Sequence, residues 1–469
     1  MSDPAFLENI TYAELTAGRT ASLTRVLAKQ DIELFASVSG DVNPAHMDED
    51  YARQDIFHGV IAHGMWLGAL ISTVLGTLLP GPGTIYLEQN IKFRKPVHIG
   101  DRITVSVTVR DIRKDKPVVT LDCRCINQAG ETVAEGLATV LAPTEKIRRL
   151  RPELPDIEIQ THDRYHTIMQ SCHNLPPVHT GVVHPVQGNV IEAVFDAVKE
   201  NLIIPILIGP RGKILAAAKE AGVDISGWKL IDTEHSHAAA AKAAELAHDG
   251  KIEAIMKGSL HTDELLSALV PPAAGLHTEH RFSHAYVMDV PGYPKPLIIS
   301  DAAVNIAPDL AAKADITQNA IDLWRVLFGM DKKPKVAILA AVETINPKMQ
   351  ATIDAGDLCK MTERGQIING IVDGPLAFDN AISLQAAQDK GITSPVAGDA
   401  DILIVPEIEA GNILVKQLTF LGHADAAGIV LGARLPIILT SRADNLRTRL
   451  LSCALAVLMA AARREGHVK

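Results

Sequence analysis

The sequence lacks the features that mark secreted and membrane proteins. It has five cysteines in 469 residues, an odd number with no Cys-x-x-Cys pair, which favours a reducing compartment. Its first residues do not show the basic and then apolar pattern of a signal peptide. The two longest apolar stretches, 64–79 and 450–462, are shorter than the ~20 residues that a bilayer requires. We therefore expect a cytoplasmic protein without a membrane partner.

Signals for nucleic acid, nucleotides and metals are also missing. The net charge of −10 argues against nucleic acid as a partner, because an acidic chain can hold anions only with local Arg, Lys and helix ends. Neither G-x-G-x-x-G nor G-x-x-x-x-G-K-[ST] is present, so no dinucleotide site or P-loop is predicted. Five histidines lie in one short span without a standard ligand spacing, so we expect no bound metal. They are His162, His166, His173, His179 and His184.

The composition is that of a packed globular chain with several cores. Hydrophobic residues make up 47% and charged residues 21%, which excludes a disordered chain. The length favours about three domains or subdomains. A charged, proline-containing segment without periodicity, 144–165, is interpreted as a linker. We expect one domain at 1–143 and another at 166–469.

The sharpest local motif is Gly40-Asp41-Val42-Asn43-Pro44-Ala45-His46, which follows a helical period. Pro44 moves Asn43 out of the α region, so the chain turns and Asp41 and His46 can approach each other. A carboxylate and an imidazole that share one water form an acid–base pair, as the addition of water to an activated double bond requires. The alternative is that Asp41 caps a helix and His46 is an ordinary turn residue.

An uncharged helix is expected after this motif, at 65–79. A helix that is apolar on all sides must be enclosed, here by the strands that follow it. Turn formers separate four such strands, expected at 86–93, 102–110, 118–127 and 131–141. One buried helix wrapped by an antiparallel sheet is the α+β hot-dog fold.

Residues 31–64 resemble the MaoC-like (R)-specific enoyl-CoA hydratases of that fold, and the match from Phe35 to His46 has no gap. The resemblance covers about 10–143. It implies that Asp41 and His46 act on water and that a backbone N–H near Gly64 polarises the thioester carbonyl.

Asn43, within the same motif, is expected to contact the substrate.

Beyond the linker, strands and helices alternate, which predicts a doubly wound parallel sheet. Strands are expected at 180–183, 203–208, 229–232, 254–256, 336–339, 367–372 and 402–405, and helices at 213–221, 237–249, 262–270, 310–327, 349–364 and 380–390, with Asp379 as the N-cap of the last. Three residues that follow strand ends, Arg211, Lys257 and Ser259, are candidate contacts to phosphate, or else ordinary loop residues.

A second candidate site follows the apolar run 436–439, which predicts a buried parallel strand. Ser441 and Arg442 come next and precede an expected helix at 443–463. A hydroxyl, a cation and free helix N–H groups can hold an anion or the oxyanion of an acyl transfer. The alternative is that Thr440 or Ser441 caps the helix and Arg442 is a surface charge.

This stretch resembles the end of the phosphate acetyl/butyryltransferase family, whose members carry Ser-Arg after a strand and a GNI-x-x-K segment before it. Further matches follow the same order at 282–285, 300–309 and 373–381, slightly closer to the butyryltransferase branch. The family implies two α/β halves with parallel sheets around a central cleft. We expect these subdomains at 166–307 plus 441–469 and at 308–440.

For catalysis, the resemblance implies that a CoA thiolate attacks an acyl phosphate while Arg442 and Ser441 stabilise the carbonyl oxygen. Thr448 stands where the acetyltransferases carry an Asp thought to act on the thiol. We therefore take the nearest carboxylate, Asp444, as the candidate base.

The two resemblances together predict a bifunctional homo-oligomer. Its substrates would be acyl-CoA and phosphate, with no tightly bound cofactor. Two alternatives remain. One domain could be only a CoA-binding or oligomerising platform, or the second could be a metal-dependent dehydrogenase of the isocitrate type, although the metal-binding aspartate cluster of such enzymes is not evident.

Overall fold

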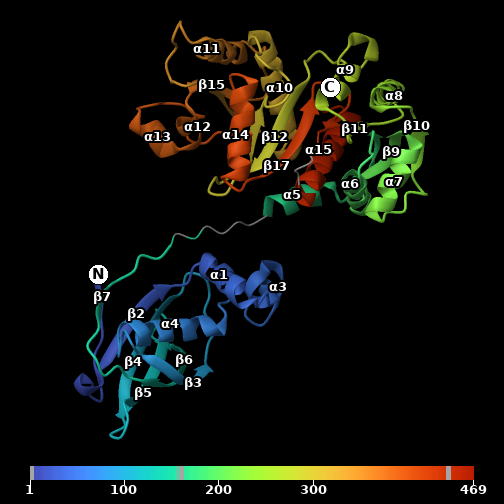
Figure 1. Ribbon diagram of the computed structural model, residues 1–469. Coiled ribbons are helices and arrows are strands. Elements are labelled where there is room, and N and C mark those ends of the chain that lie inside the picture. The colour runs from blue at the N-terminus through green and yellow to red at the C-terminus, as the bar shows by residue number, and fades with distance from the viewer. Residues whose placement is uncertain (1–4, 156, 158–162, 440–444, 469) are drawn as a thin grey trace. The chain divides into compact units, whose positions relative to one another are not determined.

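The computed structural model describes residues 5–155, 157, 163–439 and 445–468 (Figure 1). The chain forms two compact units, 1–159 and 160–469, so the division lies within the expected linker. The beginning of the expected linker, 144–165, belongs to the first unit, because β7 (Arg148–Leu150) pairs antiparallel with β1 (Phe6–Glu8). Among the described residues, no helix has both the length and the apolarity of a membrane span.

The first unit has the predicted hot-dog architecture. Its sheet is antiparallel, with the strand order β2-β4-β5-β6-β3. The bounds are β2 Thr20–Val26, β3 Ile85–Phe93, β4 Arg102–Ile112, β5 Val118–Ile126 and β6 Thr132–Leu141. Alternate residues of β4 and β5 are buried, and these side chains form a core with the apolar helix α4 (Gly64–Thr77). The sequence pattern did not indicate the edge strand β2.

Three helices occupy the segment between β2 and α4, namely α1 Lys29–Ser39, α2 Pro44–Met47 and α3 Glu49–Gln54. A 3-10 helix, η1 Tyr12–Glu14, precedes β2. The predicted Asp41–His46 motif therefore starts in the turn after α1 and ends inside α2, close in sequence to the start of the buried helix.

In the described part of the second unit, a single eleven-stranded sheet runs β10-β9-β8-β11-β18-β17-β12-β13-β16-β14-β15. The bounds are β8 Val178–Val183, β9 Ile203–Gly209, β10 Lys229–Asp232, β11 Ala254–Lys257, β12 Ser283–Asp289, β13 Leu297–Ser300, β14 Lys335–Leu339, β15 Ile371–Leu376, β16 Ile402–Ile404, β17 Asp425–Leu431 and β18 Ile437–Ile438.

This sheet contains two parallel blocks. The strands from β10 to β18 form one block, and those from β13 to β15 form the other. Between them, β17 and β12 are antiparallel to both of their neighbours. The predicted α/β class with two halves is confirmed, and the halves share one continuous sheet.

Helices cover both faces of this sheet (Figure 1). They are α5 Asp163–Cys172, α6 Gly188–Lys199, α7 Arg211–Ala221, α8 Ser236–His248, α9 Thr262–Leu269, η2 Pro272–Ala274, α10 Leu310–Phe328, α11 Gln350–Glu363, α12 Phe378–Ile382, α13 Leu384–Asp389, α14 Ile408–Phe420 and α15 Leu446–Arg464. The last is rich in Ala and Leu and is buried along most of its length, because it packs against β17.

Two capping predictions are wrong. The helix expected at 380–390 is two short helices, in which Asp379 lies inside α12 and Ser383 caps α13 by accepting from Ala386 N at 3.3 Å. Helix α15 is capped by Asn445, whose Oδ1 accepts from Thr448 N at 2.8 Å. The cap is therefore neither Thr440 nor Ser441, which lie outside the described residues.

Candidate active sites

The first candidate site starts where α1 ends. Gly40 has a φ of 74°, a left-handed conformation that favours glycine, and its N–H donates to Ala36 O at 2.8 Å. Asn43 then caps α2, since its Oδ1 accepts from Ala45 N at 3.1 Å. The Oδ1 atom of Asp41 accepts from Asn43 N at 3.2 Å. Asp41 therefore braces the turn and is not the helix cap, and the expected substrate contact of Asn43 stays a prediction.

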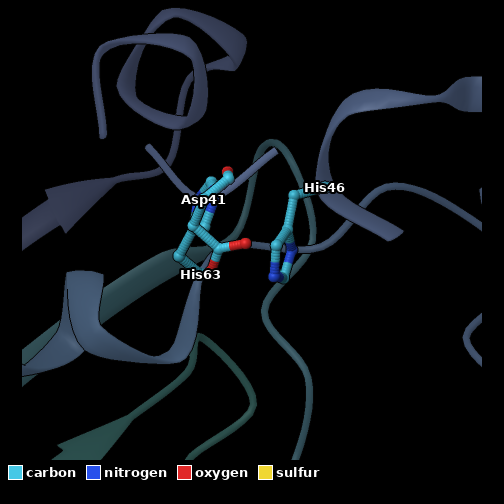
Figure 2. A group of neighbouring side chains, drawn as sticks. All are labelled: Asp41, His46 and His63. Atoms are coloured by element: carbon cyan, nitrogen blue, oxygen red, sulfur yellow. The ribbon is translucent and has the colours of Figure 1, made fainter. Parts of the chain in front are cut away.

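The turn brings Asp41 and His46 together with a third residue, His63 (Figure 2). One oxygen or ring nitrogen of each lies within 4.8 Å of the others. The ring centroids of His46 and His63 are 4.0 Å apart. Asp41 is exposed and His46 is half-buried, so water can reach the carboxylate. This convergence is the geometry that an acid–base pair on one water requires.

A backbone carbonyl orients the ring of His46. Its Nδ1 lies 2.9 Å from Ile61 O. Because a carbonyl oxygen only accepts, Nδ1 carries the proton in the neutral ring, and Nε2 has the free lone pair. His46 can therefore exchange a proton through Nε2.

His63 was not predicted as a functional residue. It is 2% exposed, and its Nε2 lies 2.9 Å from the backbone oxygen of Asp41. It also directly precedes Gly64, the first residue of α4, whose N-terminal N–H groups have no acceptor within the helix. A Cβ at Gly64 would lie 2.9 Å from Phe93 Cζ, so glycine allows β3 to approach the helix start. The sequence feature that could have identified His63 was its position directly before the apolar helix.

We expect His63→Leu to lower the turnover number for hydration on the order of 10-fold with little change in KM, because one hydrogen bond of about 0.5–1.5 kcal/mol that holds Asp41 is lost. His63→Gln can still donate to the oxygen of Asp41 and should recover part of the rate. Steady-state kinetics with crotonyl-CoA measure both variants. Equal rates for Leu, Gln and wild type would refute this positioning role.

The second candidate site is a pocket of about 720 Å³ beside the strands that separate the two parallel blocks. Adjacent strands meet there: Ile438 of β18 pairs with Ile429 of β17, which pairs with Ala285 of β12. The lining residues are Lys257, Leu260, His261, Thr262, His284, Tyr286, Ala303, Ile408, Glu409, Asn412, Ile413 and Leu439. In open α/β sheets, ligands commonly bind outside the carboxyl ends of the strands, and here Lys257 ends β11 and Leu439 follows β18.

The structure places the predicted phosphate contacts in different positions. Lys257 lines the pocket, and its Nζ donates to Leu260 O at 3.3 Å. Ser259 is not among the lining residues, and its Oγ is buried with no hydrogen-bond partner in the described part of the chain. Arg211 begins α7 after β9 and is exposed away from the pocket wall. Of the three, only Lys257 is at this site.

Ser441, Arg442 and Asp444 lie outside the described residues. Leu439, the last described residue before them, lines the pocket. The Ser441-Arg442 pair predicted from the sequence therefore begins two residues after Leu439, which lines the pocket.

His284 is a further pocket residue, and it belongs to the matching block 282–285 of the sequence. It is 1% exposed, and its Nδ1 has no hydrogen-bond partner within the described residues. Burial lowers the pKa of His284 to about 4, and the nearby carboxylate of Asp301 opposes this shift. Asp301 itself is held by three backbone N–H groups, those of Ala303, Val304 and Asn305, at 2.9–3.2 Å.

Known proteins match both parts of the chain. The family model described as MaoC like domain matches residues 13–125, and that described as Phosphate acetyl/butaryl transferase matches residues 235–457. Fold and pocket thus define a class, a hot-dog domain joined to a two-block α/β acyltransferase domain.

Individual relatives narrow this class. A phosphate acetyltransferase of Rhizobium meliloti is 55% identical over 305 residues, 65% of this chain and 96% of that protein. A phosphate butyryltransferase of Clostridium acetobutylicum is 41% identical over 271 residues, 58% of this chain and 89% of that protein. The structure of a branched-chain phosphotransacylase from Enterococcus faecalis V583 has a TM-score of 0.53 and 30% identity, with 60% of this chain and 99% of that chain covered.

The chain belongs to the phosphate acetyl/butyryltransferase family and carries a MaoC-like domain fused before it. The identities are higher to the acetyltransferase than to the butyryltransferase, opposite to the slight resemblance inferred from the motifs. The family membership gives no support to the dehydrogenase interpretation.

Proposed function

We propose that the second unit transfers an acyl group reversibly between CoA and phosphate, so that acetyl-CoA and phosphate give acetyl phosphate and CoA, or the butyryl equivalents. The observation that carries this proposal is the pocket beside β18 in a chain of this family. Lys257 supplies a cation for the phosphate. Ser441 and Arg442 follow Leu439 within a few residues, at most about 3.6 Å per residue, and would stabilise the charge that develops on the carbonyl oxygen.

We propose further that the first unit hydrates trans-2-enoyl-CoA with (R) specificity. The supporting observation is the convergence of Asp41 and His46 beside the start of α4. One group of the pair takes a proton from water, whose oxygen adds to C3, and a proton is delivered to C2. The backbone N–H near Gly64 would polarise the thioester carbonyl in this step.

The exposed edge of the first sheet supports a homo-oligomer. Apolar side chains of β3 are exposed, namely Ile85, Tyr86, Leu87 and Phe93. An unpaired, apolar edge strand readily pairs with a second copy of the chain. The proposed chemistry needs only acyl-CoA and phosphate, in the cytoplasm, without a tightly bound cofactor.

Assays on the intact chain test both proposals. Hydration of crotonyl-CoA and acylation of CoA by acetyl phosphate should both be measurable with one preparation. If only one activity is found, the other unit serves as a CoA-binding or oligomerising platform.

A coupled assay tests whether intermediates pass between the sites. We expect a mixture of Asp41→Asn and Arg442→Ala single mutants to be slower than the wild type with crotonyl-CoA plus phosphate if the sites hand over an acyl-CoA. A mixture that equals the wild type rules the handover out.

A further inference from the structure

We propose that His284 accepts the proton of the CoA thiol during acyl transfer, an inference that rests on the function proposed above for the second unit. His284 is the second residue of β12 and lines the pocket of about 720 Å³. It is 1% exposed, and its Nδ1 has no hydrogen-bond partner within the described residues. A buried polar atom without a partner is costly, and in a ligand pocket the missing partner is a group of the ligand.

The ring of His284 is held in place by its surroundings. Ser300 Oγ donates to the backbone oxygen of His284 at 2.9 Å, and the ring contacts that of Tyr286 at a centroid distance of 4.4 Å. A Cβ at Gly428 of β17 would lie 2.9 Å from Nε2, so glycine is what leaves space for the imidazole. The ring is therefore fixed by packing in the wall of the pocket, with Nδ1 buried and without a hydrogen-bond partner among the described residues.

Burial, and not the surrounding charge, keeps the imidazole of His284 neutral. Asp301, after β13, interacts electrostatically with His284 and would stabilise an imidazolium. Lys257 at the end of β11 and His261 after it line the same pocket, and Glu409 lines it from α14. Because burial lowers the pKa of His284 to about 4, the ring is neutral near pH 7 and its lone pair can accept a proton.

The proposed step conserves atoms and charge. As the sulfur attacks the acyl phosphate, a sulfur–carbon bond forms and the carbon–oxygen bond to phosphate breaks. The thiol proton moves to His284 and then to the leaving phosphate, which departs as hydrogen phosphate. His284 returns to the neutral form, and the reverse reaction uses the same path.

A pH profile separates this role from a structural one. The kcat/KM for CoA with acetyl phosphate would be measured from about pH 6 to about pH 9, around the ordinary thiol pKa of ~8.5. The wild-type profile should be nearly flat below the thiol pKa. For His284→Gln we expect kcat/KM to be about 100-fold below the wild-type value at the acidic end. This difference should shrink by about tenfold per pH unit, because the variant depends on thiolate formed in solution.

His179→Gln is the matched control, because His179 is exposed on β8 and outside the pocket. It should reproduce the wild-type profile. Profiles of His284→Gln and wild type that run parallel at every pH would overturn the inference and leave the acyl-transfer function standing. Absence of acyl transfer in the wild type would overturn both.

Folding of the variants is checked by thermal unfolding, and His284→Asn serves as the second variant. If neither variant folds, the wild-type profile still decides: a rise of about tenfold per pH unit up to the thiol pKa would mean that no enzyme group takes the proton.

Discussion

Replacing Asp41 with asparagine is expected to lower the rate of enoyl-CoA hydration by about 10³-fold, because an amide cannot exchange the proton that the carboxylate exchanges. The amide oxygen can still accept from Asn43 N, as the carboxylate does at 3.2 Å, so the turn should persist. Hydration of crotonyl-CoA by the intact chain measures the effect. Acyl transfer by the same preparation should be unchanged.

Asp50→Asn is the control for this substitution. Asp50 lies in α3, its side chain is 87% exposed, and its ion pair with Arg53 lies on the surface. We expect hydration to be unchanged in this variant. Hydration within a few-fold of wild type in Asp41→Asn, with a normal melting temperature, would remove Asp41 from the chemistry.

Replacing Lys313 with methionine is expected to lower the free energy of unfolding of the second unit by about 3–5 kcal/mol. The Nζ atom of Lys313 in α10 lies 2.6 Å from Oδ2 of Asp354 in α11, and the two side chains are 6% and 5% exposed. The substitution leaves the carboxylate of Asp354 buried, and within the described part of the chain its one remaining side-chain donor is the amide of Gln350, at 2.8 Å. Urea unfolding followed by tryptophan fluorescence measures the loss.

Two further variants show whether burial causes this effect. Lys360→Met in α11 removes an exposed ion pair with Glu363, whose side chains are 61% and 64% exposed, and should have little effect. The double variant Lys313→Met/Asp354→Leu removes both charges and should recover most of the stability. A double variant less stable than Lys313→Met alone would contradict the interpretation.

Local sequence signals predicted much of the first unit. The apolar stretch before Leu79 has no charge, so it had to be a buried helix, and α4 is that helix. Pro44 forces a turn through local sterics alone, and Asp41 and His46 converge as expected. His63 was missed because its contact with Asp41 joins residues 22 positions apart, with the helices α2 and α3 between them.

In the second unit, strand order is what the sequence could not provide. A residue after a strand lies at the correct edge of the sheet, but the pattern does not tell which strands are neighbours. Arg211 follows β9, which β8 and β11 separate from β18, and it is not among the residues that line the pocket with Lys257, the last residue of β11. For the same reason, His284 stood out only as part of the matching block 282–285, and the pairing of β12 with β17 places it in the pocket that Leu439 also lines.

Measurement of both activities on one purified, intact chain tests the central claim most directly. Our account predicts hydration of crotonyl-CoA and acylation of CoA by acetyl phosphate, with Asp41→Asn removing only the first and Arg442→Ala only the second. A preparation that shows only one of the two reactions, or substitutions that reduce both together without unfolding the chain, would contradict it.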